Sequence, residues 1–294
     1  MIRLGTRGSA LALTQARLIA DALPGETKIV PITTSGDRGP GGDKSRFVRE
    51  IENALLRGQV DLAVHSAKDV PAELPDGLAI VGVPERADSR DALCGAAALA
   101  DLPEGASVGT SSLRRRSQLL ARRPDLDVSE LRGNVDTRLR RLAEGDFDAI
   151  VLAAAGLARL DRSAEAAPID AAELVPAAGQ GCLALEARTD DEAIAAEAAA
   201  LTDPAALATL LAERALVGGL DASCRTPVGA HARMVDGRLM LSGYVGMPDG
   251  SHWIRDALGG DHGDPAALGH AVAERLRAAG AEELLAAAER SLAA

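Results

Sequence analysis

The chain has 294 residues, of which 47% are hydrophobic but only 1% are aromatic. This length suits two or three domains, and the apolar fraction excludes a disordered chain, with cores built from Ala, Leu, Val and Ile. A formal net charge of −11 and the scarcity of aromatic rings argue against a nucleic-acid-binding protein.

Residues 1–160 alternate short β-branched segments with helical patterns, which is typical of α/β folds with parallel sheets. Ligands of such sheets bind beyond the carboxyl ends of the strands, where Arg7–Ser9, His65–Asp69 and Gly109–Arg115 are found. We expect strands over 2–6, 28–32, 60–64, 78–83, 92–95, 128–131 and 149–152, a short strand ending at 109, and helices over 10–22, 47–57, 112–123 and 135–144.

Beyond Pro204 the pattern changes to that of a small α+β domain. A helix is expected over 205–217, then strands over 227–234, 238–245 and 251–258, and an Ala-rich helical tail over 265–292 that breaks near Gly280. Asp236-Gly237 and Pro248-Asp249-Gly250 suit the hairpin turns. The linker signals lie at 84–91, 168–180 and 202–204.

Membrane, metal and disulfide signals are weak. No apolar run has the length of a transmembrane helix, and the first residues lack a signal-peptide pattern, so we expect a cytoplasmic protein. The histidines and cysteines show no zinc spacing, and three cysteines without a CxxC pair do not form a disulfide framework. Cys94 and Cys182 lie in apolar runs typical of a core. Cys224 lies in a loop beside Arg225, which favours a reactive thiolate, although an inert loop cysteine is the alternative.

The segment 109–141 is an arginine-rich island in an acidic chain. It holds nine arginines and four acidic residues, a local balance of 9 − 4 = +5. Thr110, Ser111 and Ser112 suit the start of a helix, where free N–H groups and the helix dipole favour an anion. Arginine forks match carboxylates and phosphates, so we interpret Arg114, Arg115, Arg132 and Arg138 as an anion site. A solvated helix face is the interpretation favoured for the other arginines, Arg116, Arg122, Arg123, Arg140 and Arg141.

A second candidate site is the segment HSAKDVP, residues 65–71, which follows the buried-looking strand VDLAV. It places Lys68 and Asp69 side by side. A carboxylate at a strand end can stabilise a cation or transfer a proton. A helix cap or a surface ion pair is the alternative.

These motifs together resemble the porphobilinogen deaminase (hydroxymethylbilane synthase) family along almost the whole chain. The matching blocks are GTRGSALALTQA (5–16), FVREIENALLRGQVDLAVHSAKDVP (47–71), SRDAL (89–93), VGTSSLRRR (108–116), LRGNVDTRL (131–139), DAIVLAAAGLARL (148–160) and PAAGQGCLALEAR (176–188). The order and spacing of all the blocks agree with the family.

The resemblance implies an α/β fold with three domains. Two are α/β lobes like the type II periplasmic binding proteins, arranged around a cleft, and the third is a small C-terminal α+β domain. Domain 1 would be discontinuous, over 1–84 and 177–201, with domain 2 over 85–176. Domain 3, over 204–294, would carry the cysteine loop.

The resemblance also implies an enzyme, a transferase of tetrapyrrole (haem) biosynthesis. The family joins four porphobilinogen molecules head to tail, releases ammonia at each step, and frees hydroxymethylbilane by hydrolysis. The chain grows on a dipyrromethane cofactor that a thioether would attach to Cys224. The family further implies a monomer with porphobilinogen as substrate, and no nucleic-acid or membrane partner.

The family's site residues carry over by position. Asp69 matches the catalytic carboxylate and also contacts the cofactor. Other cofactor contacts would be Lys68, Thr110, Ser111, Ser112, Arg114, Arg115 and Arg132. Substrate contacts would be Arg7, Ser9, Arg138, Arg159 and Gln180. Lys44 and Phe47 match the end of a lid loop, and no metal ligand is implied.

Three departures from the family pattern concern loops. Ala222 and Ser223 replace a frequent glycine pair, Asp221 stands where glutamate is frequent, and the loop GPGGDKSRF (39–47) replaces a shorter pattern. The rival interpretations are an anion-binding protein without chemistry, a nucleic-acid-binding protein, and an inactive member of the family.

Overall fold

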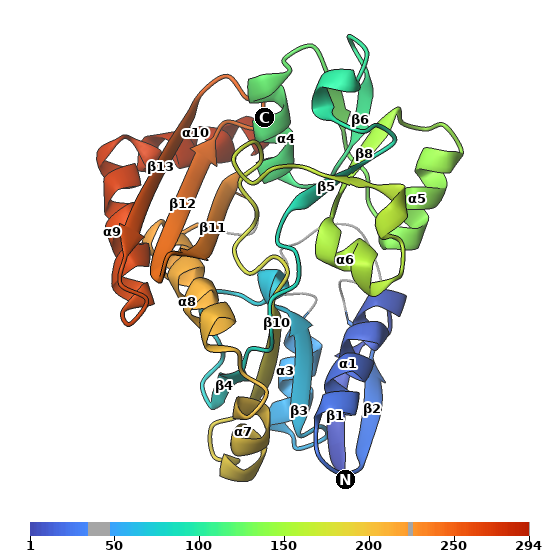
Figure 1. Ribbon diagram of the computed structural model, residues 1–294, viewed down its shortest axis with the longest axis vertical. Helices are drawn as coiled ribbons and strands as arrows, with labels where there is room; N and C mark the ends of the chain where they lie inside the picture. The colour runs from blue at the N-terminus through green and yellow to red at the C-terminus, as the bar shows by residue number, and fades with distance from the viewer. Residues whose placement is uncertain (35–47, 223–225, 294) are drawn as a thin grey trace. The chain divides into compact units, whose positions relative to one another are not determined.

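The computed structural model describes residues 1–34, 48–222 and 226–293 (Figure 1). The chain forms two compact units, of which the first comprises Met1–Ala87 with Gly181–Leu207 and the second Asp88–Gln180 with Ala208–Ala294. Lys44, Phe47 and Cys224 lie outside the described residues.

The first unit is built on a five-stranded sheet with the order β2-β1-β3-β10-β4. Strand β1 runs parallel to β2 and β3, whereas β10 runs antiparallel to β3 and β4. The strand bounds are β1 (Ile2–Arg7), β2 (Thr27–Ile32), β3 (Leu62–Ser66), β4 (Leu78–Gly82) and β10 (Leu183–Arg188).

Helices cover both faces of this sheet. On one face, α1 (Ala10–Ala22) and α7 (Glu192–Ala199) pack against side chains of β1, β3 and β10. On the other face, α3 (Arg49–Leu56) packs through Ile51 and Leu55 against Ala63 of β3. Alternation along β3 therefore sends Leu62 and Val64 to one core and Ala63 and His65 to the α3 side.

The second unit contains a five-stranded sheet with the order β7-β6-β8-β5-β9. Strand β6 is parallel to β7 and β8, and β5 is antiparallel to β8 and β9. The elements are β5 (Asp91–Cys94), β6 (Ser107–Gly109), α4 (Leu113–Arg122), β7 (Asp127–Ser129), α5 (Val135–Ala143), β8 (Ala149–Ala153), α6 (Ala154–Arg159) and β9 (Ala167–Pro168).

The expectation of parallel sheets is therefore wrong for one strand in each unit, β10 and β5. Each of these strands begins within three residues of the point where the chain enters its unit, at Gly181 and Asp88. Neither strand closes a β-helix-β crossover within its own sheet, and that crossover is what makes successive strands parallel.

The second unit also contains an antiparallel sheet, β11-β12-β13. Helices α8, α9 and α10 lie beside this sheet (Figure 1). Their residues Leu216, Leu276 and Leu285 are buried with residues of its strands in one core. The bounds are α8 (Pro204–Gly219), β11 (Val228–Val235), β12 (Arg238–Gly246), β13 (Trp253–Gly260), α9 (Pro265–Ala278) and α10 (Ala281–Ala293).

Turn chemistry places the boundaries in this part of the chain as expected. Asp236 and Gly237 both have positive φ, at 48° and 75°, as a two-residue hairpin requires. Gly280, with φ of 97°, separates α9 from α10, because a left-handed residue ends a helix. The predicted architecture, two α/β sheets plus a small α+β domain, is confirmed. The short helices α6 and α7 were not predicted from the sequence.

No single helix among the described residues is long and apolar enough to cross a membrane, although α7 and α8, with a sharp bend between them, pass that test as a pair.

Candidate functional site

In the first unit, polar residues gather at the carboxyl ends of β1 and β3, which are parallel neighbours. Arg7 is the last residue of β1, and Ser9 caps α1 by accepting a hydrogen bond from Ala12 N at 3.3 Å. After β3 the chain forms a 3-10 turn over Ala67–Asp69, in which Lys68 and Asp69 are half-buried. The structure thus brings Arg7, Ser9, Lys68 and Asp69 to one edge of the sheet.

Buried hydrogen bonds fix the strand end that carries Asp69. The Gln15 amide donates to Ser66 Oγ at 2.9 Å, and Ala67 N donates to Cys182 O at 3.1 Å. Thr6 Oγ1 donates to Val64 O at 3.3 Å. These bonds tie β3 to α1, β1 and the segment before β10, so the position of Asp69 is set by buried structure.

In the second unit, the start of α4 follows the carboxyl end of β6. Ser112 is the N-cap and accepts a hydrogen bond from Arg115 N at 3.4 Å. Thr110 Oγ1 accepts from Ser112 N at 3.2 Å, while Ser111 is exposed. The expected helix start at Thr110–Ser112 is confirmed, and its first turn carries Arg114 and Arg115.

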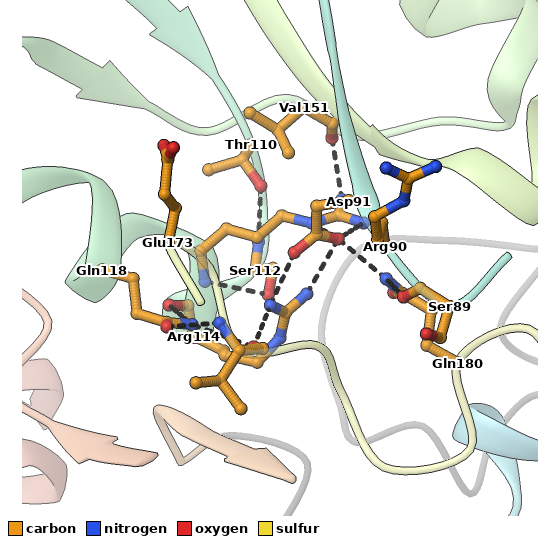
Figure 2. A network of polar contacts seen from close by, with 12 residues as sticks. Ser89, Arg90, Asp91, Thr110, Ser112, Arg114, Gln118, Val151, Glu173 and Gln180 are labelled. Atoms are coloured by element: carbon orange, nitrogen blue, oxygen red, sulfur yellow. Dashed lines mark hydrogen bonds and ion pairs between the residues drawn. The ribbon is translucent and has the colours of Figure 1, made fainter. Parts of the chain in front are cut away.

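Arg114 and Arg115 are buried and share one carboxylate, that of Asp91 on β5. Figure 2 shows Arg114 facing Asp91. Arg114 Nη1 lies 2.7 Å from Asp91 Oδ2, and Arg115 Nη2 lies 2.8 Å from Asp91 Oδ1. The guanidinium groups also donate to Val175 O and Val151 O, each at 2.7 Å. The arginines are therefore locked into the unit's interior.

Gln180 completes this buried cluster. Its amide donates to Asp91 Oδ1 at 2.9 Å and to Ser89 O at 2.8 Å, as Figure 2 shows. The cluster of Asp91, Arg114, Arg115 and Gln180 joins β5, α4 and the segment that leads out of the unit at residue 180.

The cluster keeps a net positive charge, because two guanidinium groups face one carboxylate, 2 − 1 = +1. Burial alone would raise the pKa of Asp91, but Arg114 and Arg115 outweigh that effect and hold it well below its ordinary value. Burial also lowers the pKa of Arg115. Arg114 Nε is buried and has no hydrogen-bond partner within the described residues.

The other candidate arginines occupy more exposed positions at the same end of this unit. Arg132 follows β7 and pairs with exposed Glu130 at 2.7 Å. Arg138, on α5, donates to Gly133 O at 2.8 Å, and Arg159 ends α6. Because β6, β7 and β8 are parallel, the segments that follow them share one edge of the sheet.

The five remaining arginines of the island have local partners. Arg122 and Arg123 donate to backbone carbonyls, as does Arg116 to Val128 O. Arg140 pairs with Glu144 and Arg141 with Asp146 on the surface. The sequence-based interpretation, a solvated helix face, fits Arg122 and Arg140, which are exposed. Arg116 and Arg123 are instead half-buried and donate to backbone carbonyls of other segments.

Sequence reasoning missed the role of Asp91. It was noted only as part of the block SRDAL, although a charged residue next to the apolar run ALC is a signal for a buried, paired carboxylate. Asp91 is fully buried and holds both arginines.

The two cysteines that the structure describes, Cys94 and Cys182, are buried, as expected for core residues. Burial raises the pKa of the Cys94 thiol to about 11, so it is not a thiolate at neutral pH. Within the described ranges no group of three or more histidine, cysteine or acidic side chains is arranged to hold a metal ion.

Comparison with known proteins identifies the family. The model for "porphobilinogen deaminase, dipyromethane cofactor binding domain" matches residues 2–196, and that for the C-terminal domain of porphobilinogen deaminase matches 207–278. Among solved structures, a periplasmic sulfonate-binding protein from Methylobacillus flagellatus KT aligns over 72% of this chain and 66% of its own, with 13% identity and a TM-score of 0.40.

Relatives named porphobilinogen deaminase align over nearly their full length. Porphobilinogen deaminase from Roseiflexus castenholzii is 50% identical over 97% of this chain and 98% of its own. Those from Thiobacillus denitrificans and Thermus thermophilus are each 48% identical over 97% of this chain, and over 97% and 98% of their own lengths. The chain therefore belongs to the porphobilinogen deaminase family.

Proposed function

We propose that this protein is a hydroxymethylbilane synthase that condenses four porphobilinogen molecules onto a dipyrromethane cofactor and releases hydroxymethylbilane and ammonia. The observation that carries the proposal is the buried cluster of Arg114, Arg115 and Asp91 at the start of α4, with its surplus positive charge. Each porphobilinogen brings two carboxylates, so the growing chain needs cationic partners.

The residues present fit such a cofactor. The buried Arg114 Nε lacks a partner among the described residues, and the α4 N-terminus adds backbone N–H groups beside Thr110, Ser111 and Ser112. When bound, the dipyrromethane would supply the pyrrole carbon that extends the chain. We assign its thioether anchor to Cys224, and its carboxylate contacts to Lys68, Arg114, Arg115 and Arg132.

We assign the stabilisation of the reacting pyrrole to a residue of the first unit. Asp69, held by the rigid end of β3, would stabilise positive charge on the reacting pyrrole nitrogen as ammonia leaves. Arg7, Ser9, Arg138, Arg159 and Gln180 would hold substrate carboxylates, and Lys44 and Phe47 would belong to a lid. Gln180 and the two buried arginines would contribute by shaping the pocket wall as well, since their polar groups already bind Asp91.

The remaining parts of the proposal are a monomeric protein of the cytoplasm, without nucleic-acid or membrane partners, and a three-domain division. That division assigns 1–84 and 177–201 to domain 1, 85–176 to domain 2 and 204–294 to domain 3. Most of domains 2 and 3 lies in the second compact unit.

The function is tested by adding porphobilinogen to the purified protein. We expect ammonia and hydroxymethylbilane in a ratio of four to one, from about four substrates for each product. Intact-protein mass spectrometry should show a two-pyrrole adduct before turnover. Saturable porphobilinogen binding without adduct or ammonia would instead identify an anion-binding protein or an inactive family member.

Replacing Asp69 with asparagine is expected to reduce kcat by about 100-fold, because the amide keeps the shape of the side chain and loses its charge. The adduct mass and the unfolding transition should stay those of wild type. Steady-state kinetics on the adduct-bearing protein give the comparison. Wild-type kcat in this variant would mean that Asp69 is only structural.

A further inference from the structure

A second buried group of charged side chains lies on the α3 side of the first sheet, outside the residues assigned above. It consists of Glu52 on α3, His65 on β3 and Glu186 on β10, all three of which are buried. His65 and Glu186 sit on neighbouring antiparallel strands, where Ala63 faces Glu186 and Ala184 faces His65. His65 Nε2 lies 3.0 Å from Glu186 Oε2.

The group has more acceptors than donors. The His65 Nε2–Glu186 Oε2 contact is close, but its geometry is not that of a hydrogen bond. Both Glu186 oxygens and Glu52 Oε1 are buried with no hydrogen-bond donor among the described residues. Such orphaned carboxylate oxygens are costly when both carboxyls are ionised, and a proton on one of them reduces the cost.

Burial and the charges around Glu52 together favour its protonated form. Burial, reinforced by the neighbouring charge of Glu186, raises the pKa of Glu52 to about 7, while His65 and Arg49 oppose the rise. These are the charged groups that act on Glu52 from β10, from β3 and from α3 itself. One imidazole can balance one carboxylate, so two ionised carboxylates leave an uncompensated buried charge.

The group is linked to Asp69 through the chain. His65 is on β3, directly before Ser66 and the turn that carries Lys68 and Asp69. We propose that Glu52, His65 and Glu186 form a buried proton-holding cluster that positions the end of β3, and with it Asp69, for the condensation reaction. The proposal rests on the proposed function, because it assigns these three side chains as positioning residues for that reaction.

Loss of the Glu52 proton as the pH rises makes two carboxylates repel beside β3, so the strand end shifts and kcat falls. The Glu52→Gln side chain is neutral and has nearly the shape of the protonated acid, and it cannot ionise at any of these pH values. We expect wild-type kcat to fall about tenfold between about pH 6 and pH 8.5, and the kcat of Glu52→Gln to stay nearly constant, with KM changing less than about twofold in both.

The matched control is Glu192→Gln, at an exposed position of α7 in the same unit, which should keep the wild-type pH profile. An activity-independent readout is infrared spectroscopy of the carboxyl groups. Wild type should lose a protonated-carboxyl band near neutral pH, and Glu52→Gln should lack that band.

Stability gives a third readout. Glu52 binds its proton more tightly in the folded chain, at about 7, than at its ordinary value of 4.5, so the free energy of unfolding falls as the pH rises through that interval. The fall should be smaller in Glu52→Gln than in Glu192→Gln.

The proposal is overturned if Glu52→Gln keeps the wild-type kcat profile, or if wild type shows no carboxyl titration near neutral pH. Should Glu52→Gln fail to fold, the infrared titration of wild type still decides whether the proton is held. If neither wild type nor Glu192→Gln forms hydroxymethylbilane, the proposed function fails, while the infrared result bears separately on the cluster.

Discussion

Replacing Cys224 with serine is expected to abolish the covalent adduct and the formation of hydroxymethylbilane. A serine hydroxyl is far less nucleophilic than a thiolate at neutral pH, so the thioether cannot form. Without an anchor the growing chain would leave the protein between condensations. Intact-protein mass spectrometry and product formation after incubation with porphobilinogen measure both effects.

The matched control is Cys182→Ala, because Cys182 is a buried cysteine of the first unit and is not assigned to the cofactor. It should keep the adduct mass. An adduct of unchanged mass on Cys224→Ser, together with wild-type turnover, would contradict the assignment of Cys224. Loss of the adduct in Cys182→Ala alone would move the anchor to that residue.

Local sequence patterns predicted most helices and strands, because capping residues and turn glycines near each boundary determine where it falls. The hydroxyl residues at 110–112 placed the start of α4, and Gly280 placed the break between α9 and α10. The reversed direction of β5 and β10 was not predicted. Strand direction depends on where the chain enters a sheet, and the alternation of short strands and helices is the same for both directions.

The sequence indicated which residues belong to the candidate site, but it did not indicate which of them bind one another. Spacing indicated Arg114 and Arg115 as anion ligands, and the structure shows them paired with Asp91. Their counter-ion lies more than twenty positions away along the chain, and no local pattern reveals such a pairing. The same holds for Glu52, His65 and Glu186, which three separate elements bring together. Their joint burial follows from tertiary packing, so the sequence alone could show only isolated polar residues in apolar runs.

Replacing Asp91 with alanine is expected to lower the free energy of unfolding by about 3–5 kcal/mol, the usual cost of removing one partner from a buried ion pair. Asp91 is fully buried, and both Arg114 and Arg115 depend on its carboxylate. Its loss would leave two buried cations to repel each other and would remove one of the acceptors of the Gln180 amide. Urea unfolding followed by circular dichroism measures the change.

The contribution of Asp91 to the free energy of unfolding depends on pH. The folded pKa of Asp91 lies well below its ordinary value of 3.8, so its carboxylate stabilises the fold fully above that value and progressively less as the pH falls toward the folded pKa. Wild type should therefore lose stability on acidification below about pH 4 more steeply than Asp91→Ala. The control is Asp146→Ala, which removes the surface partner of Arg141 and should cost less than about 1 kcal/mol. Equal losses in the two variants would mean that the buried cluster contributes no more than a surface ion pair, and that the arginines hold their positions without Asp91.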